Sequence, residues 1–159
     1  MISPEDLLEV SRQLGREARD IVEVAARCVC SRPLVVKTLP RLGDGTPFPT
    51  MFYLTQKSAT AAVSALEAGG YMTELQELLV QDEALAEGYQ LAHTNYLAER
   101  EQMEVVEETQ GISAGGMPTR VKCLHALVAH SLAKGKGANP IGDLALEKLS
   151  WSSEVCRCV

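Results

Sequence analysis

Two β-strands joined by a turn are predicted by the stretch Ile21-Val22-Glu23-Val24-Ala25-Ala26-Arg27-Cys28-Val29-Cys30-Ser31-Arg32-Pro33-Leu34-Val35-Val36-Lys37-Thr38-Leu39. Apolar or cysteine side chains recur at every second position from Val22 to Cys30, while Glu23 and Arg27 fall on the opposite face. A period of two is typical of a strand, because successive side chains point to opposite sides of a sheet. Ser31-Arg32-Pro33 predicts the turn, and the apolar run after it predicts the second strand of a hairpin.

A third strand is predicted at Met51–Thr55, after a segment rich in proline and glycine. Three strands so close in sequence favour an antiparallel meander with one face covered by helices. Capping residues and helical periodicity predict the helices. They are a helix from Ser3 to Gly15, one capped by Ser58 and ending at Gly69-Gly70, one around Met72–Leu79, a longer one capped by Asp82, one opened by Pro118, and a short one at Leu144–Leu149.

The chain has 159 residues, of which 46% are hydrophobic, so it is long enough to form one domain with its own core. The expected fold is α+β: a small antiparallel sheet of about three strands covered by several helices, in a single domain spanning 1–159. Glu104–Ala114 is expected to be a connector, and residues 150–159 are expected to form a flexible C-terminal tail.

The net charge of −6 argues against a nucleic-acid partner and against an anionic membrane surface, since both select clustered Lys and Arg. Aromatic residues make up 4% of the chain, too few for a platform on which bases stack. The acidic start, Met1–Asp6, is unlike a signal peptide, and the longest apolar run, Cys123–Ala133, is too short for membrane insertion. A soluble cytoplasmic protein with reduced cysteines is therefore expected.

An anion site is predicted at the start of the helix opened by Pro118. Two glycines, Gly115 and Gly116, would let the backbone approach a ligand, and the first turn would present free N–H groups with the positive end of the helix dipole. Nearby polar side chains that would hold a phosphate or carboxylate are Thr119, Arg120 and Lys122, with Asp44 and Thr46 from the turn-rich loop. The alternative is a glycine turn ahead of an ordinary core helix.

Several segments carry a resemblance to a known family: Leu39–Thr50, Tyr53-Leu54-Thr55, Leu66-Glu67-Ala68-Gly69, Ser113–His125, Val128-Ala129-His130 and Asn139–Asp143. Together they resemble a bacterial family known as domain of unknown function 501, over nearly the whole chain. The resemblance implies a small cytoplasmic protein, often encoded near a division-septum protein and a polyphosphate-type phosphatase. It implies no particular reaction.

The same resemblance implies cysteines after the first strand, in the Lys-Cys-Leu-His motif and near the C-terminus, which Cys28, Cys123 and the tail cysteines match here. It also implies a Cys or His after Tyr-Leu-Thr, where this chain has Gln56. If the family has a metal site using that position, this chain lacks it or uses other ligands, such as Cys156 and Cys158.

The five cysteines offer a second kind of site. Cys28-Val29-Cys30 and Cys156-Arg157-Cys158 each place two thiols two residues apart, so each pair could reach one metal, and Cys123 is the fifth thiol. Zinc would suit four converging thiolates, and an iron–sulfur cluster is the other candidate cofactor. The spacing matches no standard zinc finger, and plain buried thiols, disulfides and redox chemistry remain alternatives.

Helical geometry limits what Cys123 can do. At about 100° per residue, Cys123 and His125 would point about 160° apart on a helix, and Cys123 and His130 would lie about 10 Å apart along it. His125 is therefore expected to be a core histidine. A nucleophilic Cys123 with His130 or His93 as base is a further hypothesis, with catalytic residues otherwise unknown. Tyr89, His93 and Tyr96, on one helical face, are expected in the core or an interface.

The sequence thus favours a cytoplasmic binding or regulatory module with a small anionic ligand or a protein partner. The rival is a zinc or iron–sulfur protein, or a cysteine-dependent enzyme, that uses Cys28, Cys30, Cys123 and the tail cysteines. Oligomeric state is open, and a homo-oligomer is compatible with the pattern.

Overall fold

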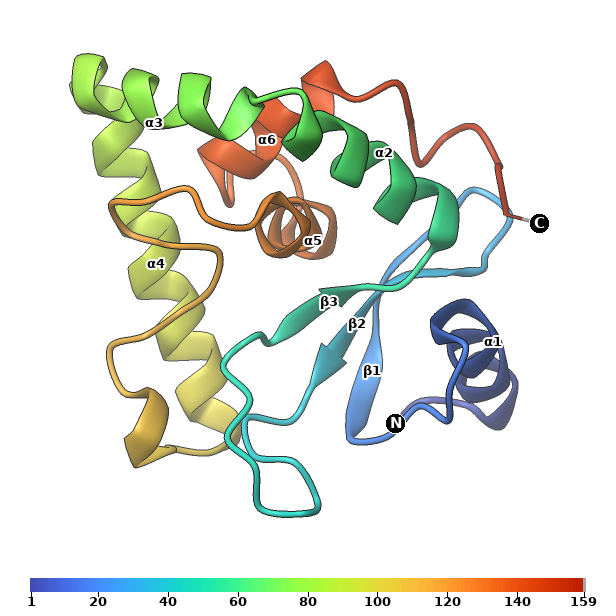
Figure 1. Cartoon of the computed structure of the whole chain (residues 1–159). Helices are drawn as coiled ribbons and strands as arrows, with labels where there is room; N and C mark the ends of the chain where they lie inside the picture. Colours follow the sequence, from blue (N-terminus) through green and yellow to red (C-terminus); the bar gives the residue numbers. More distant parts are fainter. Residues whose placement is uncertain (159) are drawn as a thin grey trace.

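The computed structural model describes residues 1–158, and Val159 lies outside the described residues. Its architecture is α+β, as predicted, with a three-stranded antiparallel sheet in the order β1-β2-β3 and helices around it (Figure 1). In chain order the elements are α1 Pro4–Leu14, β1 Ile21–Arg27, β2 Pro33–Thr38, β3 Phe52–Leu54, α2 Lys57–Ala68, α3 Tyr71–Gln81, α4 Glu83–Met103, the 3-10 helix Glu107–Thr109, α5 Leu124–Lys134 and α6 Pro140–Lys148.

The central strand β2 is covered on both faces, which explains its unbroken apolar run. Successive side chains point to opposite sides, so Val36 packs with Val10 of α1, while Val35 joins the main core together with Leu127 of α5. Figure 1 shows α1 on one side of the sheet and α5, surrounded by α2, α4 and α6, on the other. The helical layer is therefore thick on one face and a single helix on the other.

Local caps fix the helix ends that the sequence predicted. Ser3 Oγ accepts a hydrogen bond from the Asp6 amide at 3.1 Å, and Gly15 ends α1 in the left-handed conformation with φ +72°. Asp82 Oδ1 accepts from the Leu85 amide at 3.0 Å and starts α4. These three predicted boundaries are confirmed.

Three other helix starts differ from the prediction. Gln56, not Ser58, caps α2, because its Oε1 accepts from the Ala59 amide at 2.7 Å. Asn139 Oδ1 accepts from the Gly142 amide at 3.0 Å, so α6 begins at Pro140 instead of Leu144. The helix expected to open at Pro118 begins at Leu124, for reasons given below.

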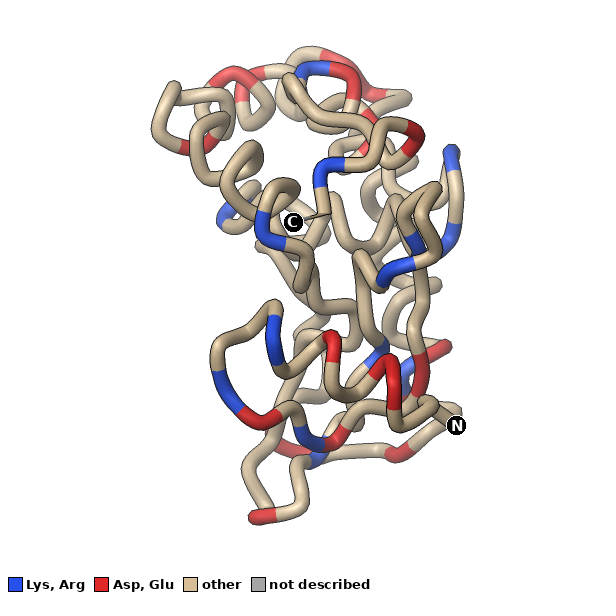
Figure 2. Tube along the Cα trace, turned by 90° about the vertical axis from the view of Figure 1, so that its right-hand side faces the viewer, with Lys and Arg blue, Asp and Glu red and all other residues tan. Residues whose placement is uncertain are grey.

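The buried face of α4 fills the centre of the molecule. Tyr89, His93 and Tyr96 are buried, as predicted for a core face. The Tyr96 hydroxyl accepts from the Met51 amide at 2.6 Å and so ties α4 to the residue before β3. Figure 2 shows both basic and acidic residues distributed along the trace on the side it draws.

Candidate metal centre

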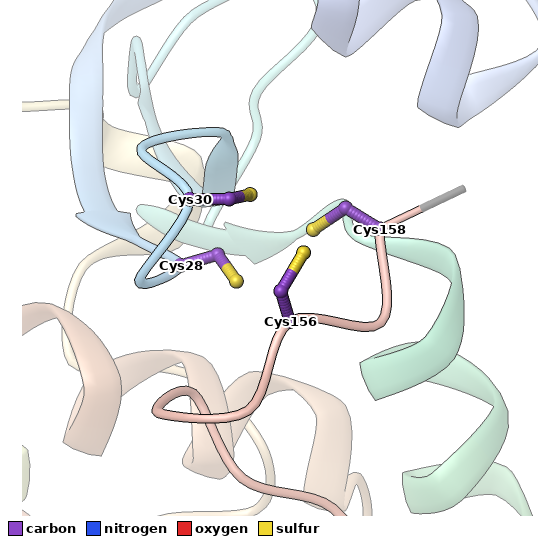
Figure 3. Close-up of side chains that lie close together, drawn as sticks. All are labelled: Cys28, Cys30, Cys156 and Cys158. Carbon is purple, nitrogen blue, oxygen red and sulfur yellow. The ribbon is translucent and has the colours of Figure 1, made fainter.

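Four of the five cysteines meet at one point (Figure 3). Cys28 and Cys30 come from the turn after β1, and Cys156 and Cys158 come from the C-terminal segment, with their side chains directed toward a shared space. The four Sγ atoms all lie within 4.8 Å of one another. All four are free thiols, Cys28 buried, Cys158 half-buried and the other two exposed. The two Cys-x-Cys pairs, far apart in sequence, thus share one site.

The turn after β1 brings its two cysteines to the same side. The strand ends at Arg27, and the backbone then closes on itself, with the Cys28 amide donating to Arg32 O at 2.9 Å and the Ser31 amide to Cys28 O at 2.8 Å. Ser31 takes a left-handed conformation with φ +74°. The expectation that Cys28 and Cys30 continue the strand face was therefore wrong: they lie in a tight turn.

The C-terminal segment reaches this turn through specific contacts. The Val29 amide donates to Ser153 O at 3.0 Å, and Arg32 Nη1 donates to Cys158 O at 2.9 Å. Gln56 also lies at the site, with its Nε2 3.3 Å from Arg157 O and 3.5 Å from Cys158 Sγ. Residues 152–158 form no helix or strand, so these contacts and the thiols position the segment.

Crowding makes the thiols unequal. The pKa of Cys30 is lowered to about 7, first by the backbone N–H of Arg32 and then by hydrogen bonds from neighbouring thiols. The pKa of Cys158 is raised, first by desolvation and then by Cys30 and Cys28. The Cys30 thiolate therefore forms readily, and its negative charge makes ionisation of the Cys158 thiol costly. A divalent cation would remove that conflict, since metal ligation deprotonates a thiol outright.

The spacing suits a single ion. A tetrahedral zinc ion with Zn–S bonds of about 2.3 Å places its sulfurs about 3.8 Å apart. Four sulfurs already within 4.8 Å need to close by only a small distance. The thiols therefore fit one thiophilic ion in both number and spacing.

Cys123 does not join this group. It is the N-cap of α5 with extended backbone angles, φ −149° and ψ 105°, and it lies with Glu67 and His125 in a second cluster. Contrary to the prediction, Cys123 and His125 do not point apart, because Cys123 is not helical. His125 is half-buried beside Glu67 and Ser64, so its expected place in the core was also wrong.

The other two histidines lie elsewhere, each with its own partner. His93 Nδ1 is 2.7 Å from Ser113 Oγ, and His130 Nδ1 is 3.1 Å from Asn139 Nδ2. His130 also stacks on Phe52, with ring centroids 5.8 Å apart. Neither histidine is grouped with Cys123, so a pairing of Cys123 with His130 or His93 has no geometric support.

The stretch Gly115–Lys122 is a closed loop, not a helix start. The amides of Arg120 and Lys122 donate to Gly116 O and Gly115 O at 2.9 and 2.8 Å, and the Val121 amide donates to Gln76 Oε1 at 3.0 Å. At the true start of α5 the Leu124 amide donates to Glu67 Oε2 at 2.9 Å. The helix-dipole reason for an anion site at Pro118 was therefore wrong, although Thr119, Arg120 and Lys122 are exposed.

The turn-rich loop contributes to a different place. Asp44 Oδ1 accepts from the Thr46 amide at 2.9 Å, and Asp44 lines a cavity of about 570 Å³ between α1 and the sheet, together with Arg16, Arg19 and Phe48. No residue of Gly115–Lys122 is among the described residues that line it. The two halves of the predicted anion surface thus do not share this cavity.

Residues 24–147 match the model of the family described as Protein of unknown function (DUF501). The chain belongs to this family. No curated protein and no solved structure matches the chain. Within residues 1–158, no helix is both long enough and apolar enough to cross a membrane.

The DUF501 match divides the candidate ligands. Cys28, Cys30 and the whole Glu67–Cys123–His125 cluster fall inside the matched residues, whereas Cys156 and Cys158 follow them. Sequence reasoning missed Glu67 and His125 as site residues and left Gln56 as a departure from the family pattern. The Cys123-Leu124-His125 motif is visible in the sequence, but whether its two side chains lie together depends on where α5 begins.

Proposed function

We propose that this DUF501 chain is a zinc protein in which Cys28, Cys30, Cys156 and Cys158 bind one ion and fasten the C-terminal segment to the β1–β2 turn. The observation that carries the proposal is the mutual approach of four Sγ atoms, within 4.8 Å, from two distant parts of the chain. Four thiolates around one ion, with no position left open, are typical of a structural zinc site.

Zinc is favoured over an iron–sulfur cluster by the small spacing of the sulfurs. In a [4Fe–4S] cluster each thiolate binds a different iron, so the sulfurs stand farther apart than around a single ion. The surroundings also suit the charge of a tetrathiolate zinc site, formally −2. Arg12, Lys57 and Arg157 line a small cavity with Cys158. Arg32 donates a hydrogen bond to the carbonyl oxygen of Cys158. These cations offset the excess negative charge.

The role that follows is control of the C-terminal segment. With zinc bound, residues 152–158 are held against the turn after β1; without it, two exposed thiols and a few hydrogen bonds remain. The expected flexibility of the tail then depends on metal. A reducing cytoplasm, the proposed location, would keep the thiols available. Exposed Arg120 and Lys122 remain a proposed surface for an anionic ligand or protein partner within this binding module.

The test is metal content by mass spectrometry on reduced protein, with and without Cys156→Ser/Cys158→Ser. The proposal expects this double substitution to remove about one equivalent of zinc, and Cys28→Ser to do the same. Ser152→Ala/Ser153→Ala is the matched control in the same segment and should retain the metal. Iron with visible absorption, disulfides between the pairs, or equal zinc in all variants would each contradict the proposal.

A further inference from the structure

A second cluster of metal-binding groups lies at the contact of α2 with α5. Glu67 is near the end of α2, Cys123 is the N-cap of α5 and His125 is in the first turn of α5. One ligand atom from each residue lies within 4.8 Å of the other two. Carboxylate oxygen, thiolate sulfur and imidazole nitrogen are all zinc ligands. This cluster contains none of the four cysteines of the first centre.

The remaining atoms of these side chains are already held in place. Glu67 Oε2 accepts from the Leu124 amide at 2.9 Å, and His125 Nε2 lies 3.1 Å from the Ser64 hydroxyl. Ser64 and Glu67 are three residues apart on α2, so they face His125 together. Metal-binding histidines and carboxylates are typically oriented by such outer contacts.

The atoms left over point at one another. Glu67 Oε1 and His125 Nδ1 are 3.3 Å apart. Two ligand atoms bound to one tetrahedral zinc at about 2.0–2.1 Å stand about 3.3 Å from each other. The carboxylate and the imidazole are therefore already at the separation that a shared ion would impose, with the Cys123 thiol beside them.

A nucleophilic Cys123 explains this geometry less well. A general base must have a ring nitrogen free to take the thiol proton. Here Nδ1 faces Glu67 and Nε2 faces Ser64, so both ring nitrogens have oxygen partners. In a catalytic triad the carboxylate and the nucleophile would bind opposite nitrogens. Here the Glu67 carboxylate and the Ser64 hydroxyl occupy the two ring nitrogens, and the Cys123 thiol interacts with the same ring, which lowers the pKa of the thiol, so the three side chains converge as a ligand set and do not form a triad.

Three protein ligands leave a fourth position for another group. Cys123 and His125 line a cavity of about 270 Å³ whose other walls include Phe52 and Leu54 of β3 and Thr60 of α2. Zinc sites with three protein ligands and an open position exchange water for other ligands, in contrast to closed tetrathiolate sites. The walls are mostly apolar and fit a small molecule with one donor atom.

We propose that Glu67, Cys123 and His125 bind a second zinc ion, which presents an exchangeable coordination position to this cavity. The formal charges of the carboxylate and the thiolate balance those of the ion, so the centre is neutral in its half-buried position. This second site is independent of the first centre, because it uses other residues and lies wholly within the part matched by the family.

Metal content separates the two sites. Fully zinc-loaded protein should hold about two equivalents, and Cys123→Ser or Glu67→Gln about one, while Cys156→Ser/Cys158→Ser keeps the ion at the second site. Glu67→Gln retains an acceptor for the Leu124 amide and so tests ligation if Cys123→Ser fails to fold. Ser64→Ala removes the hydroxyl that contacts His125 Nε2. The second site of this variant should bind zinc tenfold to a hundredfold more weakly than that of the parent.

The exchangeable fourth coordination position of the second site can be tested by visible spectroscopy. In cobalt-substituted protein, azide should change the visible spectrum, because it replaces water on the metal, and Cys123→Ser should abolish that change. Equal metal content in the parent and in both ligand variants would overturn the proposal. So would a cobalt spectrum that does not respond to azide, or alkylation of Cys123 by iodoacetamide at the same rate with and without zinc. If the parent protein binds one zinc ion that depends on Cys123 and Glu67 but not on Cys156 and Cys158, that result contradicts only the first centre.

Discussion

Trp151 donates a hydrogen bond from its indole Nε1 to the hydroxyl of Ser58 at 3.0 Å. Ser58 in turn donates to Gln56 Oε1 at 2.6 Å, and the amide nitrogen of Gln56 faces Cys158 Sγ at 3.5 Å. Trp151, which directly precedes residues 152–158, and Cys158, the last described residue, are thereby linked through the start of α2. The single tryptophan of the chain reports on this arrangement.

Zinc removal should change the fluorescence of Trp151. Trp151 is 7% exposed, and release of the segment by a chelator would admit water to its indole, so the emission should shift to longer wavelength. Cys156→Ser/Cys158→Ser should show the shifted emission before chelator is added. Cys123→Ser, the control, should respond to chelator like the parent. An unchanged spectrum in the metal-free parent would mean that zinc does not hold the segment.

Gly116 should tolerate no side chain, because the loop closes tightly around it. Its φ is +98°, and a Cβ would lie 2.6 Å from Arg120 O. Gly137 is a matched control, with φ +97° and nothing within 4 Å. Gly137→Ala should cost about 1–2 kcal/mol through backbone strain, and Gly116→Ala at least about 2 kcal/mol more. Urea unfolding of the two variants measures the difference, and equal losses would contradict the loop geometry.

Arg100 should be critical for stability although it has no described carboxylate partner. It is 2% exposed and donates to Pro49 O at 2.8 Å and to Thr109 O at 2.9 Å, which ties α4 to two loops. Arg100→Met should lower the free energy of unfolding by about 3 kcal/mol or more, since buried carbonyls lose a charged donor. The exposed Arg19→Met, which breaks a surface pair with Glu17, should change it by less than about 1 kcal/mol. Comparable losses in both variants would refute this role.

His130 should make stability depend on pH. Burial lowers the pKa of His130 to about 4 from its usual 6.5, and Asn139 enforces the neutral form. Asn139 Oδ1 accepts from Gly142, so its NH₂ group faces His130 Nδ1, which must accept. Between pH 6.5 and about 4 the unfolded chain binds the proton and the folded chain does not, so stability falls as the pH falls.

The loss across that window should approach about 3 kcal/mol, from a pKa difference of about 2.5. Urea titrations at several pH values, compared with His130→Gln, isolate this contribution from that of His93, whose pKa is also lowered by burial. A variant with the same pH dependence as the parent would show that His130 is not the titrating group.

Local signals predicted the fold well. Alternation in β1, an apolar run in β2, and the caps Ser3 and Asp82 act over a few residues, and each was placed correctly except for the end of β1, which stops at Arg27 and not at Cys30. The start of α5 was misplaced because Pro118 is a common first helical residue. The deciding contacts come from residues far away in the sequence. Gln76 and Glu67 accept hydrogen bonds from the amides of Val121 and Leu124, and these contacts hold Gly115–Lys122 as a loop instead of a helix.

The candidate sites show the same difference between local signals, which the sequence reveals, and contacts between distant residues, which it does not. Both Cys-x-Cys pairs were visible, but their convergence depends on contacts between segments such as Arg32 and Cys158, 126 residues apart. The grouping of Cys123 with His125 required Cys123 to lie outside the helix, which spacing alone does not reveal. Glu67 had no local signal beyond its place in a family motif.

Zinc K-edge absorption spectroscopy can identify the atoms that bind zinc in the four-cysteine centre. The sample is reduced, zinc-loaded Cys123→Ser, in which the second site is removed and the four-cysteine centre is intact. A tetrathiolate zinc centre should give a single shell of about four sulfurs at about 2.3 Å and no nitrogen or oxygen shell. A shell made mainly of nitrogen or oxygen, or protein that retains no zinc, would contradict the tetrathiolate centre.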